Sequence, residues 1–250
     1  MNNDPVITIP QGLVEALRRA RRVAVLTGAG ISAESGLATF RDAQTGLWAN
    51  FRPEELATAE AFERDPRMVW EWYAWRRVLI EQAQPNAGHR ALVTIEEHVP
   101  TFTLITQNID SLHQRAGSHN VVELHGNISR VKCFAENTSV EEWLAGDEVP
   151  PRCPRCGGLL RPDVVWFGEL LPEQAFEQAI EAARRCDVFF SIGTSGVVEP
   201  AASLVRVAQR YHAVTVTINL DVTPRASQYS YQINAPAGVV LPQLVQMAWP

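Results

Sequence analysis

Short, mostly apolar runs recur along the chain and predict the buried strands of a parallel sheet. The segment 173–185, before the third run, places its apolar side chains on one helical face, and so does the segment 11–22. Strands that alternate with helices favour an α/β fold whose parallel sheet is covered by helices on both faces. The four runs are residues 23–26, 102–105, 188–192 and 214–218.

Two segments interrupt this alternation. Residues 42–84 carry helical patterns and many aromatic side chains, while residues 127–160 hold three of the four cysteines. We expect both to be insertions that form a small lobe beside a sheet domain made of residues 1–41, 85–126 and 161–250. A cleft between two lobes is a common place for a ligand.

The composition narrows the class of protein. With 250 residues, of which 46% are hydrophobic, the chain can bury a core as one domain with an insertion. The formal net charge of −6 disfavours nucleic-acid binding, and no apolar run approaches the roughly 18 residues of a membrane span. The first five residues lack a signal-peptide pattern, and four cysteines are too few for a secreted disulfide framework. We expect a soluble, cytoplasmic and monomeric protein that binds neither nucleic acid nor membranes.

A glycine-rich loop follows the first predicted strand. Gly28, Gly30 and Ala33 fit the pattern G-x-G-x-x-G/A, in which the first glycine permits a tight turn and the second lets backbone approach a pyrophosphate. The alternative is a tight turn without a ligand. The acidic residue that a dehydrogenase carries about 20 positions later is missing, which disfavours hydride transfer. Asp221, after the last predicted strand, is a better candidate for binding a ribose.

Polar side chains follow two of the predicted strands, and a histidine lies further along the chain. Asn108 can hydrogen-bond an amide and Asp110 can orient a polar ligand group, while His125 is a natural general base near neutral pH. The segment 193–195 offers hydroxyl and backbone N–H groups to a phosphate or a ribose. A structural histidine and an ordinary helix cap are the alternatives for these last two features.

Taken together and in this order, five motifs resemble those of the sirtuins, which are NAD-dependent protein lysine deacylases. The resemblance covers residues 11–246, and it implies a Rossmann-like NAD-binding domain with a zinc-ribbon-like insertion in the small lobe. Each motif is weak alone, but the ordered set is specific. The motifs are Gly28–Gly36 with Phe40–Asp42, Thr106–Asp110, His125–Gly126, Val164–Glu169 and Gly193–Ser195.

The resemblance also implies roles for individual residues. His125 would be the base that deprotonates a ribose hydroxyl, and Asn108 and Asp110, also counted as catalytic, would hold the nicotinamide carboxamide and the ribose. The products would be free lysine, nicotinamide and O-acyl-ADP-ribose. The NAD-binding set would be Gly28, Ala29, Gly30, Ser32, Ala33, Glu34, Phe40, Arg41, Gln107, Asn108, Asp110, Gly193, Thr194, Ser195, Asn219, Leu220, Asp221 and Ala237. The acyl-lysine peptide would meet Val165, Trp166, Phe167, Gly168, Glu169 and Val197, pairing by strand addition.

The acyl group is suggested by a pair of residues in the helical insertion. Tyr73 and Arg76 stand three positions apart and would share one helix face, where a guanidinium can bind a carboxylate in bidentate fashion. This pair resembles that of the sirtuin branch acting on succinyl- and malonyl-lysine, in which the small Ala57 would widen the acyl pocket. The alternative is that Tyr73 only packs in the lobe and Arg76 is a solvated charge.

The cysteines predict a metal site that lacks one ligand. Cys153 and Cys156 fit the second C-x-x-C pair of the family's zinc site, but Glu136 stands where the partner of Cys133 would be a cysteine. Three alternatives remain open. Zinc is bound by three sulfurs and Glu136, or by three sulfurs and water, or the lobe folds without metal.

Two other functions compete with deacylation. One is transfer of ADP-ribose from NAD to protein, against which His125 and the Tyr73–Arg76 pair argue. The other is an NAD-sensing interaction module without catalysis, which predicts that replacing His125 changes nothing.

Overall fold

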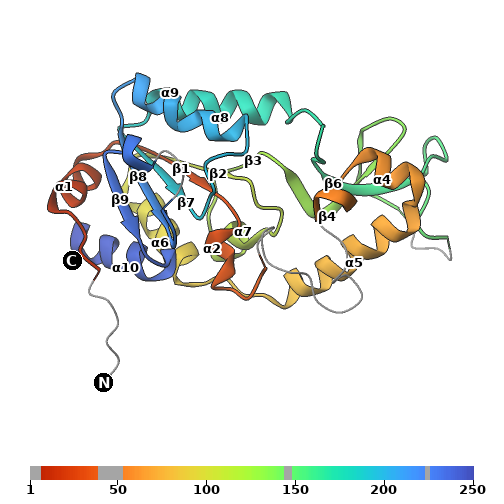
Figure 1. Cartoon of the computed structure of the whole chain (residues 1–250), viewed down its shortest axis with the longest axis horizontal. Helices are drawn as coiled ribbons and strands as arrows, with labels where there is room; N and C mark the ends of the chain where they lie inside the picture. The colour runs from red at the N-terminus through yellow and green to blue at the C-terminus, as the bar shows by residue number, and fades with distance from the viewer. Residues whose placement is uncertain (1–6, 39–52, 144–147, 223–225) are drawn as a thin grey trace.

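A six-stranded parallel sheet forms the larger of two lobes in the computed structural model, which describes residues 7–38, 53–143, 148–222 and 226–250 (Figure 1). The strand order is β3-β2-β1-β7-β8-β9, so the direction of strand addition reverses between β1 and β7. The strands are β1 (Arg22–Thr27), β2 (Thr101–Thr106), β3 (Val121–Glu123), β7 (Val188–Ile192), β8 (Val214–Asn219) and β9 (Tyr231–Asn234). In an open parallel sheet, ligands bind where the order reverses.

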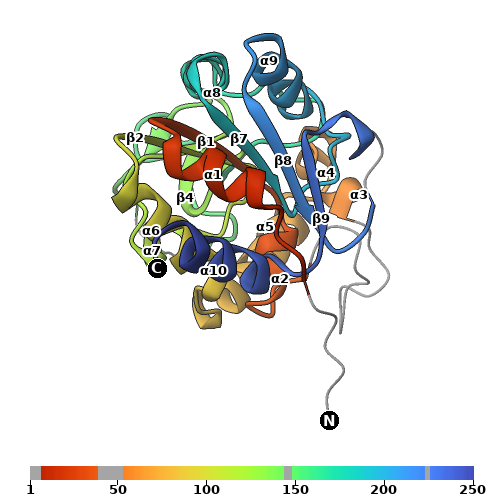
Figure 2. The same cartoon turned by 90° about the vertical axis from the view of Figure 1, so that its left-hand side faces the viewer.

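Helices cover both faces of this sheet (Figure 2). On one face lie α1 (Gln11–Arg19), α6 (Ala87–His98) and α10 (Ala237–Ala248), and on the other lie α8 (Glu173–Arg185) and α9 (Leu204–Arg210). Along β1, Val23 and Val25 belong to the first core, whereas Ala24 and Leu26 belong to the second. Burial on both faces explains why the strands read as continuous apolar runs. The predicted α/β architecture is confirmed.

Within the residues that the structure describes, the small lobe combines three helices with a three-stranded antiparallel sheet of order β5-β4-β6. Its helices are α3 (Pro53–Leu56), α4 (Ala59–Arg64) and α5 (Pro66–Gln82). Its strands are β4 (Gly126–Cys133), β5 (Ser139–Val140) and β6 (Leu160–Val164). The strand β6 therefore continues past residue 160, where we expected the sheet domain to resume.

The longest helix of this lobe has clear start signals. Pro66 occupies the first turn of α5, and the Asp65 side chain accepts a hydrogen bond from the Met68 backbone N–H at 2.9 Å. The helix packs Trp72 and Tyr73 into a core that also contains Ile128 of β4.

In the part of the chain that the structure describes, none of the helices has the length and apolar character of a membrane span.

Candidate functional site

Polar and glycine-rich loops gather at the carboxyl edge of the large sheet. Because neighbouring strands run parallel, the segments that follow them leave the sheet on the same side. Each of the first five strands in the order is followed by predicted site residues. These are Gly28–Ser32 after β1, Gln107–Asp110 after β2, His125 after β3, Gly193–Ser195 after β7 and, from the last residue of β8 onward, Asn219–Asp221.

The glycine loop is shaped by contact with a second loop. Gly30 donates its backbone N–H to the Gly193 carbonyl oxygen at 2.8 Å, and a Cβ atom on Gly30 would lie 2.7 Å from the Gly193 Cα. A Cβ atom on Gly28 would lie 2.8 Å from the Gly193 carbonyl oxygen. Gly193 itself has a φ of +61°, which favours glycine. The three glycines let β1 and β7 end in touching loops, at the point where the strand order reverses. Close approach, rather than a tight turn, therefore explains the first glycine.

A buried hydrogen-bonded group connects this loop to the end of β2. The Ser32 hydroxyl donates to the Asp110 carboxylate at 2.7 Å, and the Leu112 backbone N–H donates to the other carboxylate oxygen at 2.9 Å. The Asn108 side-chain amide donates to Ser32 Oγ and to the Gly28 carbonyl oxygen, both at 3.1 Å. Burial raises the pKa of Asp110, although these hydrogen bonds oppose the rise. The structure thus brings Asn108 and Asp110 together with Ser32 in α2 (Gly30–Ala33).

The His125 ring has a defined tautomer. Its Nδ1 lies 2.9 Å from the Gln107 carbonyl oxygen, and since a carbonyl only accepts, Nδ1 carries the proton. The other nitrogen, Nε2, is then the basic one. Burial lowers the pKa of His125 below its ordinary value of 6.5, and the hydrogen bond to Gln107 opposes this lowering. A neutral imidazole with a basic Nε2 is the form that a general base needs.

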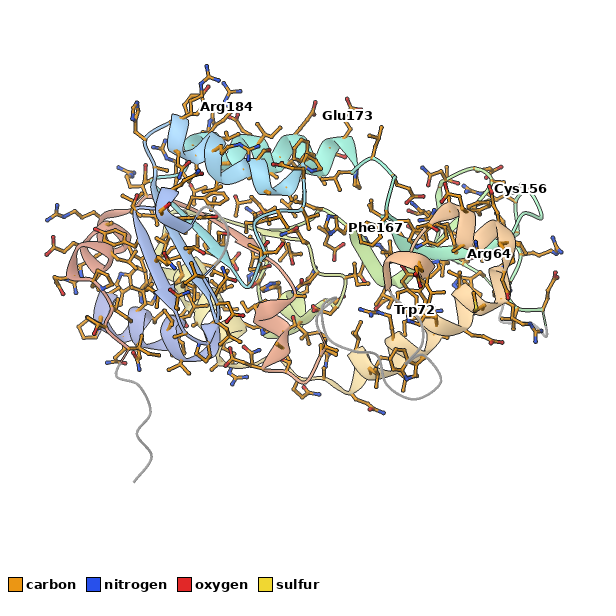
Figure 3. All side chains as sticks on the ribbon, viewed as in Figure 1. Arg64, Trp72, Cys156, Phe167, Glu173 and Arg184 are labelled. Atoms are coloured by element: carbon orange, nitrogen blue, oxygen red, sulfur yellow. The ribbon has the colours of Figure 1, made fainter. Side chains whose placement is uncertain are left out.

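The segment after β6 joins the two lobes. The Val165 backbone N–H donates to the His125 carbonyl oxygen at 3.0 Å, and the Phe167 backbone N–H donates to the Ala57 carbonyl oxygen at 2.9 Å. Phe167 is 49% exposed and lies where the lobes meet (Figure 3). This segment therefore links the backbone of Ala57, in the predicted acyl pocket, to the backbone of the candidate base His125.

The predicted acyl-binding pair, Tyr73 and Arg76, lies on α5, and each side chain contacts a tryptophan. Tyr73 is buried, and its hydroxyl oxygen accepts a hydrogen bond from Trp166 Nε1 at 2.9 Å. Burial raises the pKa of Tyr73 to about 12, so its phenol stays protonated. The Arg76 guanidinium lies over the Trp72 ring at 5.0 Å, and burial lowers its pKa, while electrostatic interactions with Tyr73 and Asp110 oppose the lowering. Arg76 thus lies within electrostatic range of the polar group at the sheet edge.

Comparisons with known proteins agree with this geometry. The family model described as "Sir2 family" matches residues 28–200. The chain belongs to the Sir2 family. A relative from Aquifex aeolicus, named NAD-dependent protein deacylase, is 56% identical over 203 residues, covering 81% of this chain and 84% of its own. NAD-dependent protein deacylase 1 of Pseudomonas aeruginosa is 46% identical over 248 residues, covering 96% and 99%.

Solved structures of the Sir2 family have the same fold. A crystal structure of a Sir2 homolog–NAD complex superposes with a TM-score of 0.90 at 44% identity, covering 97% of this chain and 94% of that one. A structure titled Sir2-p53 peptide-NAD+ superposes with a TM-score of 0.84 at 30% identity, covering 96% and 98%. The family and fold expected from the sequence are confirmed.

The remaining NAD-binding candidates of this Sir2-family chain are spread around the sheet edge. The Glu34 carboxylate accepts the Gly238 backbone N–H at 2.8 Å and so caps α10, next to the buried Ala237. Leu220 is 64% exposed and Asp221 is also exposed. Among the other members, the Gln107 amide donates to Thr194 Oγ1 at 3.1 Å, Asn219 Nδ2 donates to Thr217 Oγ1 at 3.0 Å, and Phe40 and Arg41 lie outside the described residues. Val197, which was predicted to meet the substrate peptide, is 52% exposed.

The cysteine cluster of the small lobe has the shape of a metal site. One ligand atom from each of Cys133, Glu136, Cys153 and Cys156 lies within 4.8 Å of all the others. Gly157, with a φ of +75°, lets the chain turn back behind Cys156. Backbone N–H groups of this turn lower the pKa of Cys153 to about 7, which favours the thiolate that zinc requires. The donor set therefore fits zinc, although the Glu136 carboxylate also pairs with Arg155 at 3.3 Å.

Sequence reasoning missed a polar group beneath the site. Thr27 Oγ1 donates to Thr106 Oγ1 and lies 2.9 Å from His113 Nε2, while the His113 and His89 rings have centroids 4.8 Å apart. Burial lowers the pKa of His89 to about 4, so the pair stays uncharged near neutral pH. Asn86 caps α6 and donates to the Ile31 carbonyl oxygen at 2.7 Å, which ties α6 to the glycine loop. The pattern Asn-x-x-His at the start of α6 was the available signal.

Proposed function

We propose that this Sir2-family chain is an NAD-dependent protein lysine deacylase. The observation that carries the proposal is the placement of His125, a neutral imidazole whose Nδ1 is fixed by Gln107 and whose Nε2 is left basic. The names of the relatives, which are NAD-dependent protein deacylases, support it. A related Sir2 structure titled with 2′-O-acetyl ADP ribose supports it further.

The residues at the sheet edge fit a dinucleotide. Gly28 and Gly30 leave backbone without side chains where the strand order reverses, and such loops accept a pyrophosphate. Asn108, Ser32 and Asp110 would hold the nicotinamide end with amide, hydroxyl and carboxylate groups. When bound, NAD supplies a glycosidic bond whose cleavage releases nicotinamide and leaves a ribose that accepts the acyl group.

His125 would move one proton in this reaction. The ribose hydroxyl that takes the acyl group must lose its proton, and Nε2 of a neutral His125 can accept it. The Gln107 carbonyl keeps the ring in the correct tautomer and stabilises the imidazolium that forms. The segment around Phe167 would shield the reacting groups from water and pair with the substrate backbone.

We further propose a preference for succinyl- and malonyl-lysine over acetyl-lysine. The phenol of Tyr73 is protonated and can donate, and the Arg76 guanidinium on the same helix face can bind a carboxylate in bidentate fashion. The small Ala57, whose carbonyl pairs with Phe167, would leave room for the longer acyl chain. The proposed partners are protein segments that carry acylated lysine, and we expect a monomer.

One experiment separates this function from its alternatives. A succinyl-lysine peptide, or the matched acetyl-lysine peptide, is incubated with radiolabelled NAD and with the unmutated protein or the variants Arg76→Met and His125→Tyr. Deacylation predicts label in O-acyl-ADP-ribose, no turnover by His125→Tyr, and a loss of roughly tenfold or more in succinyl cleavage by Arg76→Met, far more than in acetyl cleavage. Label that remains on protein would instead indicate ADP-ribose transfer, and binding without turnover would indicate a sensing module.

A further inference from the structure

Tyr73 obtains its hydrogen bond from a residue far away in the sequence. Trp166 Nε1 lies 2.9 Å from the Tyr73 hydroxyl oxygen, and both side chains are buried. An indole N–H can only donate, so the phenol oxygen accepts in this pair. The phenol proton therefore stays available for a second partner, and its direction is limited by the bond already made.

The Trp166 ring is itself held in one orientation. The Arg161 guanidinium lies over its face, with Cζ 3.3 Å from the ring centroid, and Phe62 packs at a centroid distance of 5.4 Å. The Trp166 backbone N–H donates to the Glu169 carboxylate at 2.8 Å. The backbone and the ring of Trp166 are thus both held in place. Simple filling of space in the core would not require contacts of this kind.

An ion pair between the buried Arg161 and the partly exposed Glu169 supports this arrangement. Arg161 is 2% exposed, pairs with both oxygens of the Glu169 carboxylate and donates to the Val164 carbonyl oxygen at 2.6 Å. Although burial raises the pKa of Glu169, hydrogen bonds from Arg161 and from the Trp166 backbone bring it below its usual value. The ion pair is therefore charged near neutral pH. Through Arg161 above the ring and Glu169 at the backbone N–H, it holds the indole of Trp166 in place.

We propose that Trp166 is a positioning residue for acyl-chain specificity, which holds the Tyr73 hydroxyl so that its proton points to the carboxylate of the acyl chain. This inference rests on the proposed preference for acidic acyl groups. A carboxylate bound by Arg76 would accept this proton, whereas an acetyl chain ends in a methyl group and has no carboxylate to accept it. The Trp166 hydrogen bond would orient the Tyr73 hydroxyl before the substrate binds. Binding of a succinyl chain would then cost less ordering of this donor, which favours succinyl over acetyl chains.

The test is the variant Trp166→Phe, which keeps an aromatic ring beneath Arg161 and removes the N–H group. The kcat/KM values for succinyl- and acetyl-lysine peptides are measured for the unmutated protein, Trp166→Phe, Tyr73→Phe and the double variant. We expect Trp166→Phe to lower the succinyl-to-acetyl ratio about three- to tenfold, mainly through the KM for the succinyl peptide. In the Tyr73→Phe background, the same substitution should leave the ratio unchanged.

The control is Trp70→Phe, which truncates a different buried tryptophan, one that lies on α5 and packs against Trp143. It should leave the ratio unchanged. An equal loss for both peptides, no loss, or a further loss of the ratio in the Tyr73→Phe background would overturn the role of Trp166. If the unmutated protein shows no preference for succinyl-lysine, the proposed preference fails, and the role of Trp166 fails with it.

Discussion

The His125 Nδ1 atom lies 2.9 Å from the carbonyl oxygen of Gln107, a residue at the end of the neighbouring strand β2. One backbone carbonyl thereby sets which nitrogen of the ring is basic. The parallel order β3-β2 places the two residues side by side at the sheet edge, although they are far apart in the sequence.

The pH dependence of activity follows from this pair. Burial lowers the pKa of His125 below 6.5, and the base must be neutral, so activity is lost only when the pH falls through that lowered value. We expect the acid limb of kcat/KM to have its midpoint below pH 6.5, measured with a peptide that does not titrate in this range. An acid limb above pH 6.5 would contradict a buried neutral base.

Asp110 is expected to serve function at the expense of stability. Its pKa is raised by burial, so the folded state binds the proton more tightly than the unfolded state, and ionisation near neutral pH destabilises the fold. Asp110→Asn should therefore keep or raise the thermal midpoint, while its KM for NAD rises or its kcat falls by about tenfold or more. Calorimetry and steady-state kinetics measure the two effects. A strongly destabilised variant with normal kinetics would show instead that Asp110 stabilises the fold and has no role in the reaction.

The loop contact between Gly30 and Gly193 is expected to resist any side chain. A Cβ atom on Gly30 would meet backbone atoms of Gly193 at 2.7 Å and 2.9 Å, and backbone cannot move aside as a flexible side chain can. Gly30→Ala should lower the free energy of unfolding by about 1–3 kcal/mol and weaken NAD binding. Denaturant unfolding and titration calorimetry check this, and unchanged values for both would show that the loops can separate at little cost.

The sequence predicted the sheet domain well because its strands are buried on both faces. The apolar runs 23–26 and 102–105 became β1 and β2 with one further residue at each end. The strands β3 and β9 were missed, since Val121–Glu123 and Tyr231–Asn234 are too short to show periodicity.

From the sequence, site residues could be predicted only where the type of side chain and its motif indicate a chemical role. His125 and Asn108 were identified from motifs, but the tautomer of His125 depends on Gln107, which only the sheet order brings near. The contact between Trp166 and Tyr73 joins residues 93 positions apart, and no local pattern indicates it. Trp166 was expected to face the substrate, and the structure places it 2% exposed in the core of the small lobe.

The cysteine cluster predicts a zinc ion that stabilises the small lobe. It lies at the end of that lobe, where Figure 3 labels Cys156, away from Phe167 at the junction of the lobes. We expect about one zinc per chain, bound more weakly than by four thiolates, and tighter binding in Glu136→Cys. Metal analysis of protein purified without added zinc, followed by competition with a chelator, measures both. A folded protein with a zinc content near zero would show that the lobe does not need metal.

The most direct test of the account is the acyl preference of the unmutated protein. Matched peptides carrying acetyl-, propionyl-, malonyl-, succinyl- and glutaryl-lysine are incubated with NAD, and the products are followed by mass spectrometry. Tyr73 and Arg76 predict that kcat/KM for succinyl- or malonyl-lysine exceeds that for acetyl-lysine by about tenfold or more, with O-acyl-ADP-ribose formed in each turnover. A preference for acetyl-lysine, or NAD binding without any acyl transfer, would contradict it.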